Sequence, residues 1–391
     1  MRLTDNLLQC KINPDDENGP CETCMKLANK TTRLPCIRRK ITEVKLFKPG
    51  QVQGFEWTRR WKDSIVDNIA KWASAEDRVI RVSEGYTTRF VELRVRAFVP
   101  QDGDKLERTW VYNGVKKSAP IPPYAIVDLD AAQASYTDYI NRGIAECIDS
   151  IFGNKDGLLA RTYQLAWHRA QNQDVSEDER ALLLLTLRLW MAVRLTTRST
   201  FIVGDETLGM ARDIMDRTSP NHGCIPLPPV MGAQLDLILI HHIQAKLRRD
   251  MLDRLQRMTQ SNKQKTWLTT YLVTFILLHN IALLTQHDAG YARKHGIKVG
   301  SRFRPWRVGR RVEFKQQLIL RFLQRRFARE KDVEEYHLGE KSPPPSSTFG
   351  SISMWTSSTT GGLSLAGLGG RSSCSPERLN WAGDVVPLTS R

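Results

Sequence analysis

Four cysteines near the amino terminus are the residues whose type and spacing best suit a chemical role. The chain has 391 residues and seven cysteines, and four of the seven lie close together: Cys10, Cys21, Cys24 and Cys36. Cys21 and Cys24 form a CxxC pair that can bind one ion from a single turn, which Gly19 and Pro20 favour. Four thiolates around one ion make a closed tetrahedral site, which is typical of structural zinc. The spacing therefore predicts a zinc site.

Two other interpretations of these cysteines stay open. The first is that the four thiols are unligated and belong to a polar, loop-rich arm. The second is a redox pair made by Cys21 and Cys24, which the sequence favours less because no βαβ pattern surrounds them. The zinc site thus remains the leading hypothesis.

The order of the cysteines resembles the second half of a fungal zinc binuclear (Zn2Cys6) cluster. Transcription factors of that family hold two zinc ions with six cysteines. The last four of those six have counterparts here: Cys10, then the loop NPDDENGP, then the two cysteines of CETC, then the cysteine of LPCIRRK. The stretch from Cys36 to Ile65 also resembles the segment behind the cluster in a subset of the family. The resemblance implies zinc as a cofactor and DNA-phosphate contacts by Arg38, Arg39 and Lys40. Such contacts position a protein on DNA without reading its sequence.

The first half of that cluster has no counterpart in the sequence. In the family the first cysteine bridges both metals, and a basic segment before the third cysteine enters the major groove. Here RLTDNLLQ, with the single Arg2, stands in that place. Four thiolates suffice for one zinc ion but not for the usual two. The resemblance therefore predicts a truncated or divergent relative in the nucleus, with impaired or altered DNA binding.

A strongly basic balance favours an anionic partner. The net charge is +16 and the isoelectric point is about 9.7, which suits DNA or an acidic protein surface, including the transcription machinery. A second basic stretch interleaves its charges with Phe303 and Trp306, a pattern that suits phosphate binding and base stacking. It is also typical of a nuclear import signal, and a solvated helix face is the alternative. Its central arginines are Arg302, Arg304, Arg307, Arg310 and Arg311.

Periodicity predicts the elements that position these residues. Apolar residues recur with helical spacing over 54–77, whereas 78–100 alternates and predicts two strands, with a third at 108–114. Helices are predicted over 128–153, from a capping box of Ser176 and Glu179 onward, near 231–260, over 263–288 and about 310–333. The Ser, Gly and Pro content from Ser342 predicts disorder.

The longest apolar run, from Trp267 to Leu284, is about long enough to span a bilayer. It carries Thr269, His279 and Asn280, polar side chains that are costly in lipid but find partners in a protein core. We therefore expect a buried helix and no membrane partner.

These observations predict a mainly α-helical chain with a small β-containing segment. We expect a cysteine-rich arm over 1–50, a helix with a small sheet over 51–124, an α-helical regulatory-type domain over 125–333, and a disordered tail over 334–391. No linear catalytic motif such as GxSxG or HExxH is present, and no enzyme is predicted. The expected function is that of a fungal transcriptional regulator of Zn2Cys6 type or a relic of one. The alternative is a helical protein-interaction module without DNA binding. Oligomeric state is not predicted.

Overall fold

A computed structural model describes residues 58–61, 69–153, 155, 157–261 and 264–294. The arm over 1–50, the basic helix expected at about 310–333 and the tail from Ser342 lie outside these residues. The described part of the chain forms a sheet, a separate hairpin and a set of helices.

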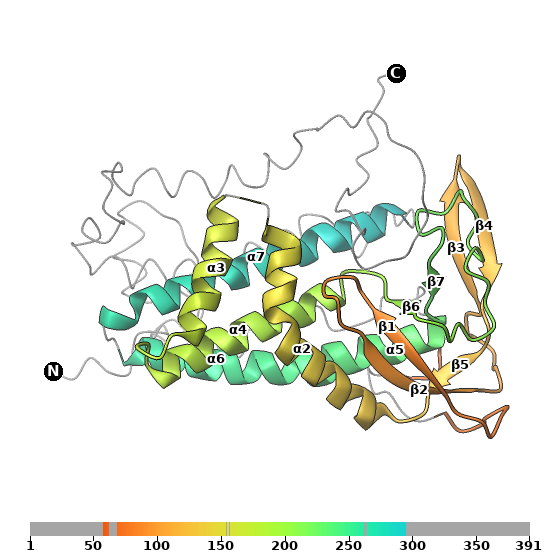
Figure 1. The fold of residues 1–391 in the computed structure, drawn as a ribbon, viewed down its shortest axis with the longest axis horizontal. Coiled ribbons are helices and arrows are strands. Elements are labelled where there is room, and N and C mark those ends of the chain that lie inside the picture. The colour runs from red at the N-terminus through yellow and green to blue at the C-terminus, as the bar shows by residue number, and fades with distance from the viewer. Residues whose placement is uncertain (1–57, 62–68, 154, 156, 262–263, 295–391) are drawn as a thin grey trace, which may run out of the picture.

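The centre of the fold is a five-stranded antiparallel sheet that curls into half a barrel (Figure 1). Its strand order is β5-β2-β1-β6-β7. The strands are β1 (Arg78–Ser83), β2 (Val91–Ala97), β5 (Tyr124–Ile126), β6 (Phe201–Val203) and β7 (Ile225–Pro226). β6 and β7 come from far along the chain, so long-range pairing completes the sheet.

Alternating side chains give the sheet one apolar face and one charged face. Ile80 and Val82 of β1 and Leu93 of β2 point to the same side and are at most 1% exposed. Arg81 and Glu92 face each other across the same two strands on the opposite, exposed side. Because side chains alternate with a period of two, one face of each strand must be buried. The helices cover that face.

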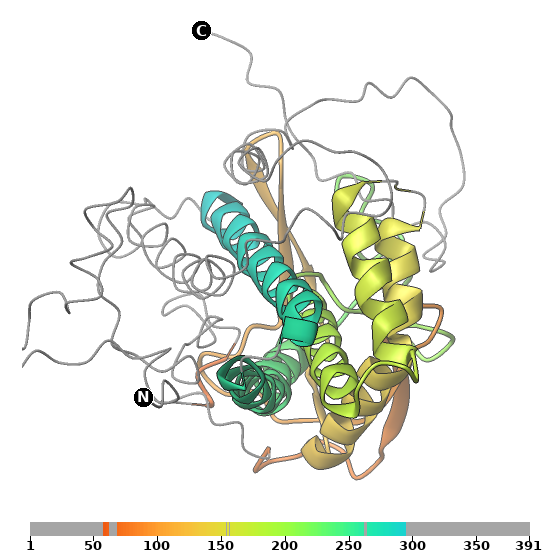
Figure 2. The same ribbon diagram turned by 90° about the vertical axis from the view of Figure 1, so that its left-hand side faces the viewer.

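In the part of the chain that the structure describes, seven helical elements follow or interrupt the strands. They are α2 (Leu129–Phe152), α3 (Leu158–Gln171), α4 (Glu177–Leu195), α5 (Pro229–Leu237), the π-helix η2 (Ile238–Gln244), α6 (Ala245–Gln260) and α7 (Trp267–Lys294), with a short 3-10 turn at Gln264–Thr266 before α7. Helix α2 lies against β2, while α4 packs against α2, α3, α6 and α7. Figure 2 shows α4, α6 and α7 side by side.

Helix α4 is central, as its apolar run from Leu183 to Trp190 predicts. The ring of Trp190 is fully buried and lies 4.8 Å from that of Tyr163 on α3, measured between centroids. The ring of Phe152, at the end of α2, stacks on Tyr163 at the same distance. These three aromatic rings join α2, α3 and α4 in the core.

Helix α7 contains the long apolar run and contributes to the core. Val273 and Ile276 are fully buried, and Thr274 Oγ1 donates to the carbonyl oxygen of Thr270 at 2.6 Å. The segment from Gln264 to Asp288 is long and apolar enough to cross a membrane, yet half of its most apolar window is buried inside the protein. The helix is thus partly buried: His279 bonds Tyr163, as expected of a core residue, whereas the side-chain oxygen and nitrogen of the buried Asn280 have no hydrogen-bond partner among the described residues.

A separate hairpin, β3 (Glu107–Tyr112) and β4 (Val115–Pro120), stands beside the sheet (Figure 1). Its two-residue turn is Asn113-Gly114, and both residues have positive φ angles, of 49° and 77°. Positive φ at both positions defines the type I′ turn, which Asn-Gly favours strongly. The strand predicted at 108–114 is thus confirmed, and its partner β4 was missed because VKKSAP is polar and contains proline.

The predicted mainly α fold class is wrong. Helix makes up about 52% of the structure and strand about 16%, and the strands form a curled half-barrel rather than a small β segment. The sequence pattern misses β5, β6 and β7 because they are two or three residues long and lack a measurable alternation. The pairing of β6 with β1 in addition joins residues more than 100 positions apart, such as Ile202 and Val82.

Two local predictions also need correction. Residues 58–61 and 69–77, expected to be helical, are extended or bent, and Trp72 forms a β-bridge with Phe98. The aromatic residues spaced like a helix face pack instead onto the outside of the sheet. Helix α4 does begin after Ser176, but the expected capping box is absent, because Ser176 Oγ bonds the carboxylate of Glu179 at 2.8 Å instead of a backbone N–H.

Candidate functional site

The residues predicted to bind zinc or DNA lie outside the described part of the chain. They are Cys10, Cys21, Cys24, Cys36, Arg38, Arg39, Lys40, Arg302, Arg304, Arg307, Arg310 and Arg311. Their predicted roles stay predictions. The described residue nearest to the cysteine arm in sequence is Thr58, and the contacts made there form the candidate site.

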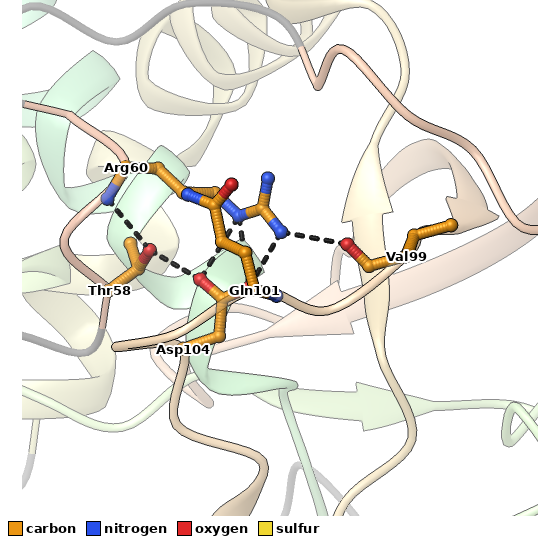
Figure 3. Close-up of polar contacts among 5 residues, drawn as sticks. All are labelled: Thr58, Arg60, Val99, Gln101 and Asp104. Carbon is orange, nitrogen blue, oxygen red and sulfur yellow. Dashed lines mark hydrogen bonds and ion pairs between the residues drawn. The ribbon is translucent and has the colours of Figure 1, made fainter.

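Thr58 and Arg60 attach the chain that follows the arm to a tight turn after β2. We call this contact the arm anchor; it comprises Thr58, Arg60, Val99, Gln101 and Asp104 (Figure 3). The turn is closed by two bonds between Gln101 and Asp104. The amide of Asp104 donates to the Gln101 carbonyl oxygen at 3.1 Å, and the Gln101 amide donates to Asp104 Oδ2 at 3.0 Å.

The Asp104 carboxylate then accepts bonds from the incoming chain. Arg60 Nη2 donates to Oδ2 at 2.6 Å, Arg60 Nε lies 3.0 Å from both oxygens, and Thr58 Oγ1 donates to Oδ1 at 2.6 Å. Arg60 Nη2 also donates to the Val99 carbonyl oxygen at 2.9 Å. A forked guanidinium–carboxylate contact of this kind fixes orientation as well as adding energy.

The ion pair within the arm anchor is largely buried, which makes it more consequential than a surface pair. The side chains of Arg60 and Asp104 are 10% and 1% exposed. Burial raises the pKa of Asp104, but the bonds from Arg60, Thr58 and the Gln101 amide, with the charge of Arg60, outweigh it and hold that pKa below its ordinary value. Removing one partner of a buried pair leaves the other charge uncompensated.

A small apolar cluster surrounds the arm anchor. It contains Ile69, Phe98, Ala125 and Val230, with Trp61, Trp72 and Leu106 packed against it. The guanidinium of Arg60 lies 4.9 Å from the centre of the Phe98 ring, a cation–π contact. The cluster joins the chain before β1 to β5 and to the start of α5, on the outer side of the sheet.

Gly103 is required by the geometry of the turn. Its φ angle is +90°, and a Cβ there would lie 2.9 Å from the Cδ of Arg59. Only glycine adopts that conformation readily and also leaves room for Arg59. The Asp102-Gly103 pair is a turn signal in the sequence, but the pairing of Asp104 with a residue 44 positions earlier carries no sequence signal.

A second buried polar group lies at the end of β1. Glu84 is fully buried, and its Oε1 accepts bonds from Tyr136 Oη at 2.9 Å and Thr200 Oγ1 at 3.0 Å. Burial raises the pKa of Glu84, and the bonds from Tyr136 and Thr200 oppose that rise. This group ties β1 to α2 and to the segment before β6, so we interpret it as structural.

His279 on α7 also has a structural role. His279 Nδ1 lies 2.7 Å from Tyr163 Oη, and burial, with the charge of Arg194, lowers its pKa to about 3. It is therefore a neutral core residue, as predicted. Among the described residues, no three His, Cys, Asp or Glu side chains are grouped as metal ligands.

Arginines on the outer face of the sheet form ion pairs. Arg81 Nε lies 3.1 Å from Glu92, and Arg96 Nε lies 2.6 Å from Asp77. Arg94 lies within 3.6 Å of both Asp77 and Asp128. The carboxylates offset much of the positive charge, so this face differs from a continuous basic track.

The comparison with known proteins decides the family. Residues 47–339 match the sequence profile of the KpeA transcription factor family, which is well over half of the chain. The chain belongs to the KpeA transcription factor family. The matched region includes the arm anchor and the basic stretch around Arg302–Arg311, and it begins after Lys40.

A curated relative agrees with membership in the KpeA family. The satratoxin biosynthesis SC3 cluster transcription factor SAT20 of Stachybotrys chartarum is 24% identical over 313 residues. The alignment covers 76% of this chain but only 41% of the relative, so the chain spans about two fifths of that protein. No solved structure matches the chain. The expectation of a fungal transcription factor is confirmed at this level, and the Zn2Cys6 type stays a prediction.

Replacing the carboxylate of the arm anchor tests its role. We expect Asp104→Asn to weaken the attachment of residues 58–61 by roughly 3 kcal/mol, because Arg60 stays buried without its counter-charge. Hydrogen exchange of the peptide spanning these residues measures the loss. Asp102→Asn is the matched control, since it removes the same charge from an exposed position in the same turn. Equal exchange in the two variants would contradict the assignment.

The same variants test the pH dependence of the arm anchor. The folded pKa of Asp104 lies below its ordinary value of 3.8, so the stabilisation is complete above that value and is lost as the pH falls through the folded pKa. We expect the difference in exchange between wild type and Asp104→Asn to be constant at neutral pH and to shrink below pH 3.8. If the difference in exchange between wild type and Asp104→Asn persisted in stronger acid, ionisation of Asp104 would not be its cause.

Proposed function

We propose that this chain is a fungal transcriptional regulator of divergent Zn2Cys6 type that acts in the nucleus. Membership in the KpeA transcription factor family supports the role in transcription and argues against an enzyme. On this proposal Cys10, Cys21, Cys24 and Cys36 bind one structural zinc ion, the number that four thiolates satisfy. The arm and the folded body would then be two parts of one regulator.

The arm would reach DNA through phosphate contacts. Three basic residues lie between Cys36 and the arm anchor in the sequence: Arg38, Arg39 and Lys40. A second basic set consists of Arg302, Arg304, Arg307, Arg310 and Arg311. The single observation that supports this arrangement is the buried pair of Arg60 and Asp104. It fixes Thr58 and Arg60, which follow the basic residues in the sequence, against the body.

A second candidate is an interaction module that does not bind DNA. The ion pairs on the outer face of the sheet favour it, since arginines already matched by carboxylates gain less from phosphates. On this view the basic segments bind acidic proteins of the transcription machinery. The two candidates differ in zinc content and in affinity for DNA.

Zinc content of the purified full chain tests the metal site. We expect about one zinc ion per chain, and loss of nearly all of it in the double variant Cys21→Ser with Cys24→Ser, because two ligands of four are removed. Elemental analysis after dialysis gives the stoichiometry. Cys374→Ser, a distant cysteine outside the cluster, should keep the metal. A wild-type chain without zinc would refute the site.

Salt-dependent binding to a mixed-sequence duplex tests the phosphate contacts. Each neutralised phosphate contributes about 0.9 to the slope of log affinity against log salt concentration. We therefore expect the triple variant Arg38→Ala, Arg39→Ala and Lys40→Ala to reduce the slope by up to about 2.7. Fluorescence anisotropy of a labelled duplex measures it. An unchanged slope would remove these residues from the interface, and no binding by wild type would favour the interaction module.

A further inference from the structure

The free edge of the β3–β4 hairpin differs from the covered edge of the main sheet. At the main sheet's edge strand β5, Gln234 of α5 covers the backbone of Ile126: its Oε1 accepts from the amide at 2.8 Å, and its Nε2 donates to the carbonyl at 3.2 Å. Within the part of the chain that the structure describes, β4 pairs only with β3. Uncovered edges are places where a further strand can pair.

The register identifies the backbone groups on that edge. Tyr112 and Val115 flank the two-residue turn and pair with each other, as do Trp110 with Lys117 and Arg108 with Ala119. In such a hairpin these are the hydrogen-bonded pairs, and the residues between them point their N–H and C=O groups outward. Lys116 and Ser118 therefore present both groups on the free edge of β4.

The hairpin is fastened to the body on one face and has exposed apolar side chains near its turn. Trp110 Nε1 donates to Thr218 Oγ1 at 3.0 Å, and Lys117 Nζ lies 3.0 Å from Asp216, so one face is fastened to the body. Toward the turn, Val111, Tyr112 and Val115 are 58%, 45% and 61% exposed. Tyr112 and Val115 form a cross-strand pair on the face that Trp110 fastens, whereas Val111 points to the opposite face, so Val115 is the exposed apolar side chain that lies on β4 beside the free edge.

The positive charge of Lys116 indicates which kind of strand can pair with the free edge of β4. Lys116 is exposed on this edge and forms no ion pair among the described residues, while the whole chain carries a net charge of +16. A second copy would bring like charges together, whereas an acidic segment would complement them. Lysine on an edge strand commonly prevents pairing, but the exposed Val115, on the face opposite to Lys116, offers an apolar contact to alternate side chains of an added strand.

We propose that the edge of β4 binds an extended segment of a partner protein in which acidic and aliphatic residues alternate. The segment adds as a third strand beside β4, with backbone bonds to Lys116 and Ser118, aliphatic contacts to Val115 on one face and carboxylates near Lys116 on the other. Strand addition of this kind draws affinity from the main chain and specificity from alternate side chains. The proposal goes beyond zinc and DNA binding and does not depend on either.

A proline substitution on the edge tests the proposal directly. The probe is a fluorescein-labelled ten-residue peptide of alternating Glu and Val, titrated against the full chain by anisotropy. Ser118→Pro removes an outward N–H without touching the β3–β4 bonds and should weaken binding about tenfold, the effect of one backbone hydrogen bond. Ser118→Ala keeps that N–H and should bind like wild type. Circular dichroism confirms that each variant is folded.

Charge reversal gives a second, independent readout. Lys116→Glu should weaken the Glu-Val peptide and strengthen a Lys-Val peptide that binds poorly to wild type. Equal affinity of wild type for the two peptides, or equal affinity of Ser118→Pro and Ser118→Ala, would overturn the proposal. It would also be overturned if sedimentation showed self-association that Ser118→Pro abolishes, because the occupant would then be a second copy.

Discussion

The apolar face of the curled sheet is the constraint on which the rest of the structure depends. Strands β1 and β2 place Ile80, Val82 and Leu93 on one side, and such a face must be removed from water. Helix α2 lies against β2, and α4 in turn packs against α2. Glu84 adds a polar tie at the rim, where Tyr136 of α2 bonds its carboxylate. Helices α3, α6 and α7 then pack around α4, while α5 packs against β5 and η2.

The opposite face of the same sheet connects the body to the arm. There Arg60 and Asp104 form a buried pair, and Phe98 and Trp72 pack beside them. A buried pair adds little net stability compared with apolar residues, but it tolerates few alternative geometries. Its value in a transcription factor would be orientation, since it determines where the chain leaves the body toward the basic residues and cysteines. The outer arginines nearby are matched by carboxylates, which leaves the arm and the basic stretch as the proposed DNA contacts.

The β5 edge of the main sheet and the β4 edge of the hairpin differ in whether a side chain covers their backbone groups. At the β5 edge, Gln234 bonds both the amide and the carbonyl of Ile126, and both residues are buried in the core. The β4 edge instead carries the exposed Lys116 and Val115 on a hairpin fastened by Trp110 and Lys117. An unpaired backbone edge is tolerated in water but invites a partner.

The sequence by itself determined the long elements, because their signals are local. Helices α2, α4 and α7 and strands β1 and β2 follow from periodicity over many residues, and the Asn113-Gly114 turn follows from its residue types. Only the tertiary structure decided that 58–61 and 69–77 are not helical, because Trp72 and Phe98 gain more by pairing on the sheet. It also decided the half-barrel and the arm anchor: β6 pairs with β1, and Asp104 with Arg60, across distances in sequence that no local pattern encodes. The predicted zinc ligands rest on sequence alone, since spacing within a short segment is the signal that four thiolates need.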